Sequence, residues 1–124
     1  MIRKKHTILI VGASGVVGAA ALNHFAALPD WNVIALSRRF VNLPFLAQHV
    51  SVDLTDRKAC EQAATGLSDV THIFYAALYE LPELVAGWQD PKQMAVNEAM
   101  LRNLLVCPQI IMIASIQMIA LFAR

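Results

Sequence analysis

Charged residues are scarce in this chain. They make up 15% of its 124 residues, and ten Lys and Arg against nine Asp and Glu leave a net charge of +1. A chain so close to neutral has no electrostatic basis for binding nucleic acid or an anionic membrane surface. We therefore expect neither nucleic acid nor a membrane as a partner.

Cysteine is also rare, with Cys60 and Cys107 as its two occurrences. They stand far apart, which matches neither the ligand spacing of a metal site nor a disulfide framework. We expect two buried or incidental thiols, no metal site, and a protein of the reducing cytoplasm.

Hydrophobic residues are abundant instead, at 57% of the chain. A parallel sheet buried on both faces needs such a composition, and so does a fragment that has lost the partner covering its core. The length suffices for one domain but is short for a complete doubly wound fold.

The most informative stretch is Thr7-Ile-Leu-Ile-Val-Gly-Ala-Ser-Gly-Val-Val-Gly18. It predicts a strand over about 7–12, a tight glycine turn, and a helix over about 15–28, which together open a dinucleotide-binding βαβ unit. Gly12 allows the sharp turn, Gly15 allows close approach of a pyrophosphate, and Gly18 allows close packing of helix on strand. The phosphates would meet free N–H groups at the helix N-terminus. The cofactor residues that we assign to this turn are Gly12, Ser14, Gly15, Val16, Val17 and Gly18.

Two arginines follow the next predicted strand, residues 31–37. An NAD site usually has an acidic residue there for the ribose hydroxyls, but this chain has Ser37, Arg38 and Arg39. Guanidinium groups bind a 2′-phosphate through charge-assisted, often bidentate hydrogen bonds. We therefore predict NADP(H) as the cofactor, with Arg38 as the leading contact; solvated loop charges are the alternative.

Two further strand ends complete the predicted site. Residues 48–53 form the third strand, whose end offers Asp53 for the adenine amino group and Leu54 as an apolar wall. A helix over about 56–66 follows, capped by Thr55 or Asp56. The fourth strand spans 70–77, and Ala76 and Ala77 at its end are small enough to leave room for the nicotinamide side of the cofactor.

No residue is assigned as catalytic. A tyrosine can serve as a catalytic proton donor when a lysine lies one helical turn away. Tyr75 and Tyr79 have no such lysine, so we interpret both as core or cleft-wall residues. His72 is interpreted as a packed or hydrogen-bonded histidine.

The remaining residues change in character. A helix is predicted over 91–105, with Met94, Asn97 and Met100 on a largely inward face. A fifth strand could follow at 110–114. We divide the chain into a dinucleotide-binding domain, 1–106, and an atypical apolar tail, 107–124. Residues 104–123 carry no charge, which raises a membrane span as an alternative, although Pro108, Gln109 and Gln117 interrupt the run.

The order of these motifs resembles the progesterone 5β-reductase and iridoid synthase-like branch of the atypical short-chain dehydrogenase/reductase superfamily. The matching stretches are Gly12–Gly18, Ser37–Arg39, Val52–Leu54, Thr71–Tyr75 and Asn97–Asn103. The resemblance implies a Rossmann-type doubly wound parallel sheet, here incomplete with four to five strands. It also implies reduction of an enone carbon–carbon double bond, or of an aldehyde, by NADPH. It places Ser14, Gly15 and Val16 at the pyrophosphate, Arg38 and Arg39 at the 2′-phosphate, and Asp53 and Leu54 at the adenine.

The chain departs from that family after about Val106. Where the family carries a catalytic lysine motif, this chain reads Ile113-Ala-Ser-Ile-Gln-Met-Ile119, and no lysine follows Lys92. A truncated or frame-shifted product would explain this, and the isolated chain would then lack the catalytic Tyr and Lys. A non-catalytic NADP-binding sensor or regulatory module, or a sugar-nucleotide epimerase-like protein, are the alternatives. The uncovered sheet edges predict dimerisation or aggregation of the isolated chain.

Overall fold

A computed structural model describes residues 5–44, 47–79, 90–107, 110 and 115–118. Its strands form one parallel five-stranded sheet in the order β3-β2-β1-β4-β5. The elements in chain order are β1 (His6–Val11), α1 (Val16–Ala26), β2 (Trp31–Ser37), β3 (Gln48–Ser51), α2 (Arg57–Ala64), β4 (His72–Tyr75), α4 (Pro91–Leu105) and β5 (Ser115–Met118). The predicted incomplete Rossmann-type fold is confirmed.

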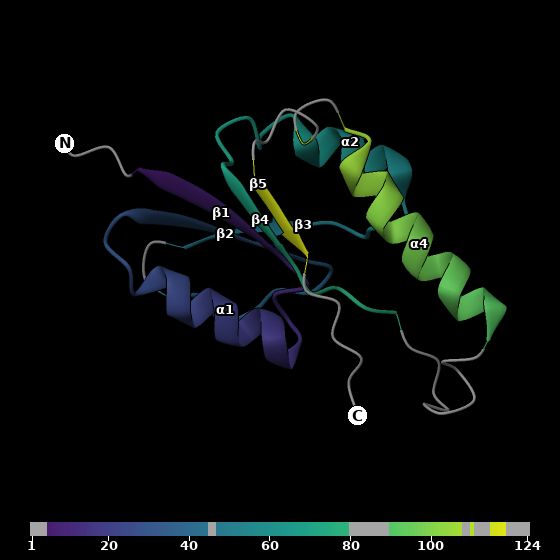
Figure 1. Ribbon diagram of the computed structural model, residues 1–124, viewed down its shortest axis with the longest axis horizontal. Coiled ribbons are helices and arrows are strands. Elements are labelled where there is room, and N and C mark those ends of the chain that lie inside the picture. Colours follow the sequence, from purple (N-terminus) through teal and green to yellow (C-terminus); the bar gives the residue numbers. More distant parts are fainter. Residues whose placement is uncertain (1–4, 45–46, 80–89, 108–109, 111–114, 119–124) are drawn as a thin grey trace.

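The sheet lies between two helix layers, with α1 on one face and α2 and α4 on the other (Figure 1). Side chains alternate between the two faces along β1 and β2, as the pleat requires. Ile8 and Ile10 pack with Leu22 of α1, whereas Leu9 and Val11 pack with Leu104 of α4. Burial on both faces accounts for the continuous apolar runs and the hydrophobic composition.

Capping side chains explain where α2 and α4 begin. Asp56 accepts a hydrogen bond from the N–H of Ala59, so α2 begins with a side-chain cap. The prediction of a cap by Thr55 or Asp56 is thus met by Asp56. Asp90 caps α4 in the same way, and Pro91 occupies the first helical position, where its missing N–H costs nothing.

Two predictions from the sequence were wrong in the C-terminal part. The fifth strand spans Ser115–Met118 rather than 110–114: Ile110 is buried but lies outside any strand, and 111–114 fall outside the described residues. Met94 is 57% exposed rather than inward-facing, although Met100 and Leu104 of the same helix are buried. Met94 lies in the first turn of α4. Helical spacing alone does not tell which apolar residues a neighbouring element covers.

Candidate functional site

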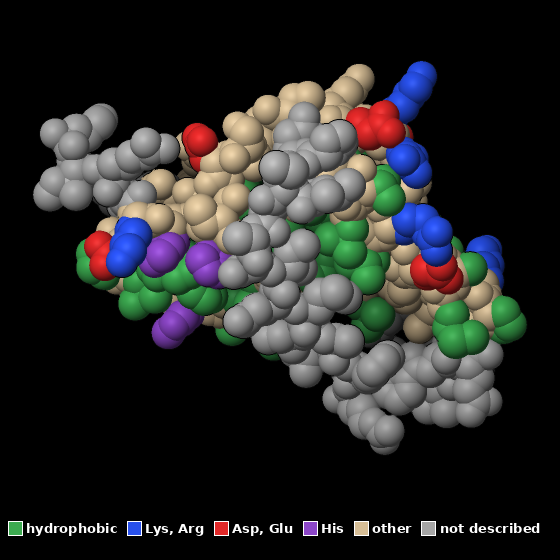
Figure 2. All heavy atoms as spheres, turned by 45° about the horizontal axis from the view of Figure 1, so that its top comes forward, with side chains coloured by type: hydrophobic (Ala, Val, Ile, Leu, Met, Phe, Trp, Pro, Cys, Tyr) green, Lys and Arg blue, Asp and Glu red, His purple; other side chains and the backbone are tan. Residues whose placement is uncertain are grey.

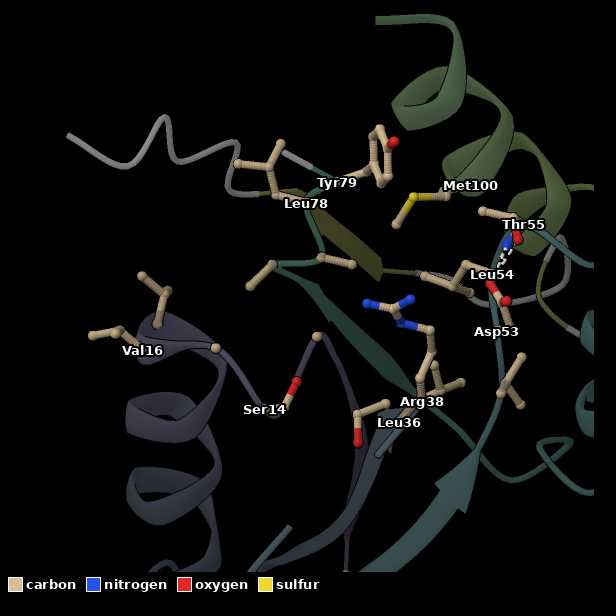
Figure 3. A pocket seen from close by; sticks show the side chains of 17 residues that line it. Ser14, Val16, Leu36, Arg38, Asp53, Leu54, Thr55, Leu78, Tyr79 and Met100 are labelled. Carbon is tan, nitrogen blue, oxygen red and sulfur yellow. Dashed lines mark hydrogen bonds between the residues drawn. The ribbon is translucent and has the colours of Figure 1, made fainter. Parts of the chain in front are cut away.

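A pocket of about 410 Å³ opens at the carboxyl ends of β1, β2, β3 and β4. In a parallel α/β sheet, ligands bind beyond these ends, near the point where the strand order reverses. Here that point lies at β1, which has β2 on one side and β4 on the other. The pocket is lined by Gly12, Ser14, Gly15, Val16, Val17, Leu36, Ser37, Arg38, Val52, Asp53, Leu54, Thr55, Ala76, Ala77, Leu78, Tyr79 and Met100 (Figure 3).

The three glycines of the first turn have three different structural reasons. Gly12 has φ +86°, and a Cβ there would lie 2.6 Å from the backbone nitrogen of Ala77. At Gly18 an added Cβ would lie 2.0 Å from the carbonyl oxygen of Gly12, so this glycine lets α1 pack against the turn. At Gly15 the nearest atom would be that same oxygen at 3.6 Å, an ordinary contact. The fold itself therefore does not require a glycine at position 15. The space in front of Gly15 belongs to the pocket.

The start of α1 offers hydrogen-bond donors beside that space. Gly15 is the N-terminal cap residue and has no side chain to accept from the first N–H groups of the helix. The first four N–H groups of a helix have no partner within it. Val16, the first helical residue, is 89% exposed. The turn therefore presents open backbone donors at the positive end of a helix dipole, which suits an anionic group.

Arg38 supplies the positive charge of the pocket. Its guanidinium lies between the glycine turn that carries Ser14 and the segment that carries Asp53 and Leu54 (Figure 3). Within the described residues this guanidinium donates no hydrogen bond. It is therefore free to donate to a ligand from the end of β2.

Asp53 stands across the pocket as an ionised acceptor. Its Oδ1 accepts from the Thr55 hydroxyl at 2.7 Å and from the Thr55 N–H at 3.0 Å. These two hydrogen bonds, with a smaller contribution from the Arg38 charge, hold the pKa of Asp53 below its usual value. No hydrogen bond to its Oδ2 is found in the described part of the chain, so this oxygen can accept from a ligand.

Asn97 fixes the wall formed by Tyr79. Its Oδ1 accepts from the Tyr79 N–H at 2.7 Å, and its Nδ2 donates to the Tyr79 carbonyl at 2.9 Å. This two-point clamp sets the position of the chain at the pocket rim. Asn97, which the helical spacing placed on a largely inward face, is half-buried and spends its amide on this backbone contact.

Two residues assigned from the sequence lie outside the lining. Gly18 is buried beneath the turn and acts through packing, as its predicted role requires. Arg39 is exposed and does not line the pocket, so the structure does not bring the second guanidinium to it. Sequence reasoning missed Leu36, Val52, Thr55, Leu78 and Met100 as lining residues. Helical spacing had placed Met100 on an inward face, which was the available signal for it.

The described titratable side chains near the core are poorly suited to proton transfer. Burial raises the pKa of Tyr75 to about 12, so its hydroxyl stays protonated at neutral pH. Burial, and to a smaller extent the neighbouring Cys107, raises the pKa of Cys60 to about 11, and burial raises that of Cys107 as well. Both thiols are inert in this form.

Within the part of the chain that the structure describes, no group of three or more His, Cys, Asp or Glu could hold a metal ion. None of the helices in these described residues has the length and apolar content needed to cross a membrane.

Known proteins similar to this chain include one curated enzyme. The (S)-8-oxocitronellyl enol synthase of Catharanthus roseus is 28% identical over 110 residues, which cover 82% of this chain and 25% of that protein. The chain therefore spans about a quarter of the length of this relative. The match confirms the resemblance to the iridoid synthase-like branch, in its N-terminal part.

Two solved structures share the fold. A short chain dehydrogenase from Burkholderia cenocepacia, determined in complex with NADP, has a TM-score of 0.68 at 21% identity and covers 85% of this chain and 47% of its own. The ligand-free aldohexose dehydrogenase of Thermoplasma acidophilum has a TM-score of 0.72 at 16% identity, with 94% and 49% covered. The chain spans about half of each.

A family model covers most of the described fold. The model of the NAD dependent epimerase/dehydratase family matches residues 8–108, from β1 to just past α4. That range includes the glycine turn, Arg38, Asp53 and every other residue that lines the pocket. With the parallel sheet and the position of the pocket, this match shows that the chain belongs to the NAD dependent epimerase/dehydratase family.

Proposed function

We propose that this chain is the NADP(H)-binding part of a short-chain-type oxidoreductase and that the cofactor occupies the pocket at the carboxyl end of the sheet. The observation that carries the proposal is the guanidinium of Arg38, which stands free inside the pocket at the end of β2. An NAD-binding protein of this fold usually has a carboxylate there to accept from the ribose hydroxyls. An arginine donates instead, which suits a 2′-phosphate.

The residues present fit the other parts of a dinucleotide. The space in front of Gly15, where an added Cβ would meet no protein atom closer than 3.6 Å, allows a pyrophosphate to approach the backbone. The open N–H groups at the start of α1 would donate to its oxygens. The residues that hold the pyrophosphate in this proposal are Gly12, Ser14, Gly15, Val16 and Val17.

The adenosine end fits the opposite side of the pocket. Leu54 is buried and can pack against the adenine ring, while Asp53 Oδ2 accepts from its amino group. The lowered pKa of Asp53 keeps the carboxylate ionised, which strengthens this hydrogen bond. Ala76 and Ala77, at the end of β4, leave room for the nicotinamide side.

The bound cofactor would supply a hydride, and we propose an enone carbon–carbon double bond or an aldehyde as the acceptor. The similarity to an enol synthase supports this substrate class. The chain's own residues bind and orient the cofactor, and we assign none of them as an acid or base. The acid or base of the catalytic step is therefore left unassigned in this proposal.

Calorimetric titration of the chain with NADPH and with NADH tests the cofactor. We expect NADPH to bind at least tenfold more tightly, which is about 1.4 kcal/mol. Arg38→Ala should reduce NADPH affinity to the level of NADH and leave NADH binding unchanged. Arg102→Ala is the charge-matched control, because Arg102 is exposed on α4 and pairs with Glu98. Equal binding of both cofactors by the parent chain would overturn the NADP assignment.

A sugar-nucleotide epimerase-like protein is the second candidate, favoured by the description of the family to which the chain belongs. The same titration separates the two, because an NAD-dependent epimerase would prefer NADH. Enone-dependent loss of NADPH absorbance then tests the substrate class directly.

A further inference from the structure

His49 of β3 supports the turn that carries the two arginines. Its Nε2 lies 2.8 Å from the hydroxyl oxygen of Ser37, at the end of β2. The same hydroxyl donates to the carbonyl oxygen of Arg39 at 2.5 Å. One side chain of the third strand thus reaches the backbone of the arginine turn through a single serine.

The protons of this chain of contacts can be assigned. A serine hydroxyl has one hydrogen, and the Arg39 carbonyl can only accept. The hydroxyl hydrogen therefore goes to Arg39, and the oxygen of Ser37 is left as an acceptor. His49 Nε2 must then carry a hydrogen and donate it to Ser37, which fixes the tautomer of the imidazole if the ring is neutral.

Two further contacts hold the same turn. The Ser51 hydroxyl donates to the carbonyl oxygen of Arg38 at 3.0 Å, so two successive carbonyls are bound by serines. The ring of Phe40 meets the His49 ring edge-on, with centroids 5.6 Å apart. Ser37 is 5% exposed, which shields its hydrogen bonds from competing water.

The Arg38 side chain gains no comparable support. Its guanidinium lies in the pocket without a hydrogen bond to any described residue (Figure 3). A long, mobile side chain pays an entropic cost when it binds, and a fixed backbone reduces that cost. The positions of Arg38 and Arg39 therefore depend on the backbone contacts made by Ser51 and Ser37, and Ser37 in turn is held by His49.

We propose that His49 is a specificity-determining positioning residue, which holds the Arg38–Arg39 turn through Ser37 so that Arg38 distinguishes NADPH from NADH. This inference rests on the proposed function and identifies a residue that sets the cofactor preference of the proposed site. His49 does not line the pocket. It acts through the position of Arg38, the group that we assign to the 2′-phosphate, so its effect should fall mainly on NADPH.

Paired variants test the relay in the full chain. His49→Leu removes the donor, and His49→Gln keeps an N–H donor on a side chain of similar reach. We expect His49→Leu to weaken NADPH binding about fivefold to tenfold, the effect of one lost hydrogen bond, and to change NADH binding less than about twofold. His49→Gln should recover most of the NADPH affinity. Ser37→Ala should match His49→Leu, and the double variant should lose little more than either single one, because both break the same relay.

A second measurement uses the unaltered chain, in case His49→Leu does not fold. Long-range ¹H–¹⁵N correlation spectra of the imidazole should show a hydrogen on Nε2 of His49. A neutral ring with its hydrogen on Nδ1 would break the relay and overturn the inference.

The outcomes separate this inference from the proposed function. A parent chain that prefers NADPH, with His49→Leu weakening both cofactors equally or neither, would overturn the role of His49 alone. Equal behaviour of the Leu and Gln variants would do the same. A parent chain that binds neither cofactor, or both equally, would overturn the proposed NADP site and this inference with it.

Discussion

At the amino end of the sheet, His6 of β1, Trp31 of β2 and His72 of β4 pack their rings against one another, whereas at the carboxyl end the same three strands run into turns around a pocket. The ring centroids of Trp31 lie 4.6 Å from His6 and 4.9 Å from His72. Figure 2 shows histidines gathered beside hydrophobic side chains on one part of the surface. The hollow described near the amino end has about 180 Å³, against about 410 Å³ at the carboxyl end.

The two ends of the sheet also differ in how far their polar groups are hydrogen-bonded within the protein. At the amino end, the Thr71 hydroxyl accepts from the Thr7 N–H at 2.9 Å and donates to the Thr7 carbonyl at 3.0 Å. At the carboxyl end, the Arg38 guanidinium and the first N–H groups of α1 have no described partner. One end thus satisfies its polar groups internally, and the other leaves them for a ligand. Substitutions of these polar groups at the amino end should therefore affect stability, and substitutions of those at the carboxyl end should affect binding.

The largest effect on stability is expected where the turn packs against α1. Gly18→Ala would place a Cβ 2.0 Å from the Gly12 carbonyl oxygen, a clash of the methyl group with backbone that no rotamer relieves. We expect a loss of about 3 kcal/mol or more in the free energy of unfolding, measured by urea denaturation.

Gly66→Ala is the matched control for this variant. Its Cβ would meet only the Ala63 carbonyl oxygen, at 3.8 Å. The stability of this control should change by less than about 1 kcal/mol. Equal losses in the two variants would show that helix packing does not explain the glycine at position 18.

Gly15→Ala should reverse this pattern. Its Cβ meets no atom closer than 3.6 Å, so the stability should stay within about 1 kcal/mol of the parent chain. The methyl group occupies the space that we assign to the pyrophosphate, so NADPH affinity should fall at least tenfold in calorimetry. Unchanged NADPH binding would show that the pyrophosphate does not lie at this turn. The carboxyl end would then no longer differ from the amino end in leaving its backbone donors for a ligand.

The N-terminal part of the fold was predictable because its signals are local. Runs of apolar residues, glycine spacing, and Asp56 before α2 each determine structure within a few residues. The positions of Arg38 and Asp53 then followed from where a parallel sheet gathers its strand ends. The lining by Leu36, Val52 and Met100 was not predictable in this way, because it depends on which side chains the strands and α4 bring together across the sheet.

The contacts that sequence reasoning missed join residues that are far apart in the sequence. Asn97 clamps the backbone of Tyr79, and His49 reaches Arg39 through Ser37; neither pairing has a spacing rule. The fifth strand was placed too early because the continuous apolar run at 110–114 is a stronger strand signal than residues 115–118, in which polar and apolar residues alternate. Only pairing with β4, which matches His72 with Ser115, selects the register.

A smaller loss of stability is expected at the amino end. Thr71→Val removes the hydroxyl that serves both the N–H and the carbonyl of Thr7. A buried N–H left without its partner costs about 1–2 kcal/mol. Thr71→Ser keeps the hydroxyl and should recover most of this loss in urea denaturation. NADPH affinity should be unchanged in both variants; a parallel loss of affinity would show that the two ends are coupled.

The smallest effect concerns acid stability at the carboxyl end. The Thr55 hydroxyl and N–H, followed by the Arg38 charge, lower the pKa of Asp53 in the folded chain. A carboxyl group with a lowered folded pKa adds stability at neutral pH, and this contribution is lost as the pH falls below about 4. The effect is small because the carboxylate is exposed to solvent, which screens its interactions. Asp53→Asn should make the fall in unfolding free energy between neutral pH and pH 3 less steep. Thr55→Val should raise the pKa of Asp53 toward its usual value in a carboxyl ¹³C titration. A pKa that stays low in this variant would show that the hydroxyl is not its main cause and would leave the position-55 N–H, which a valine retains, and the Arg38 charge to hold it down.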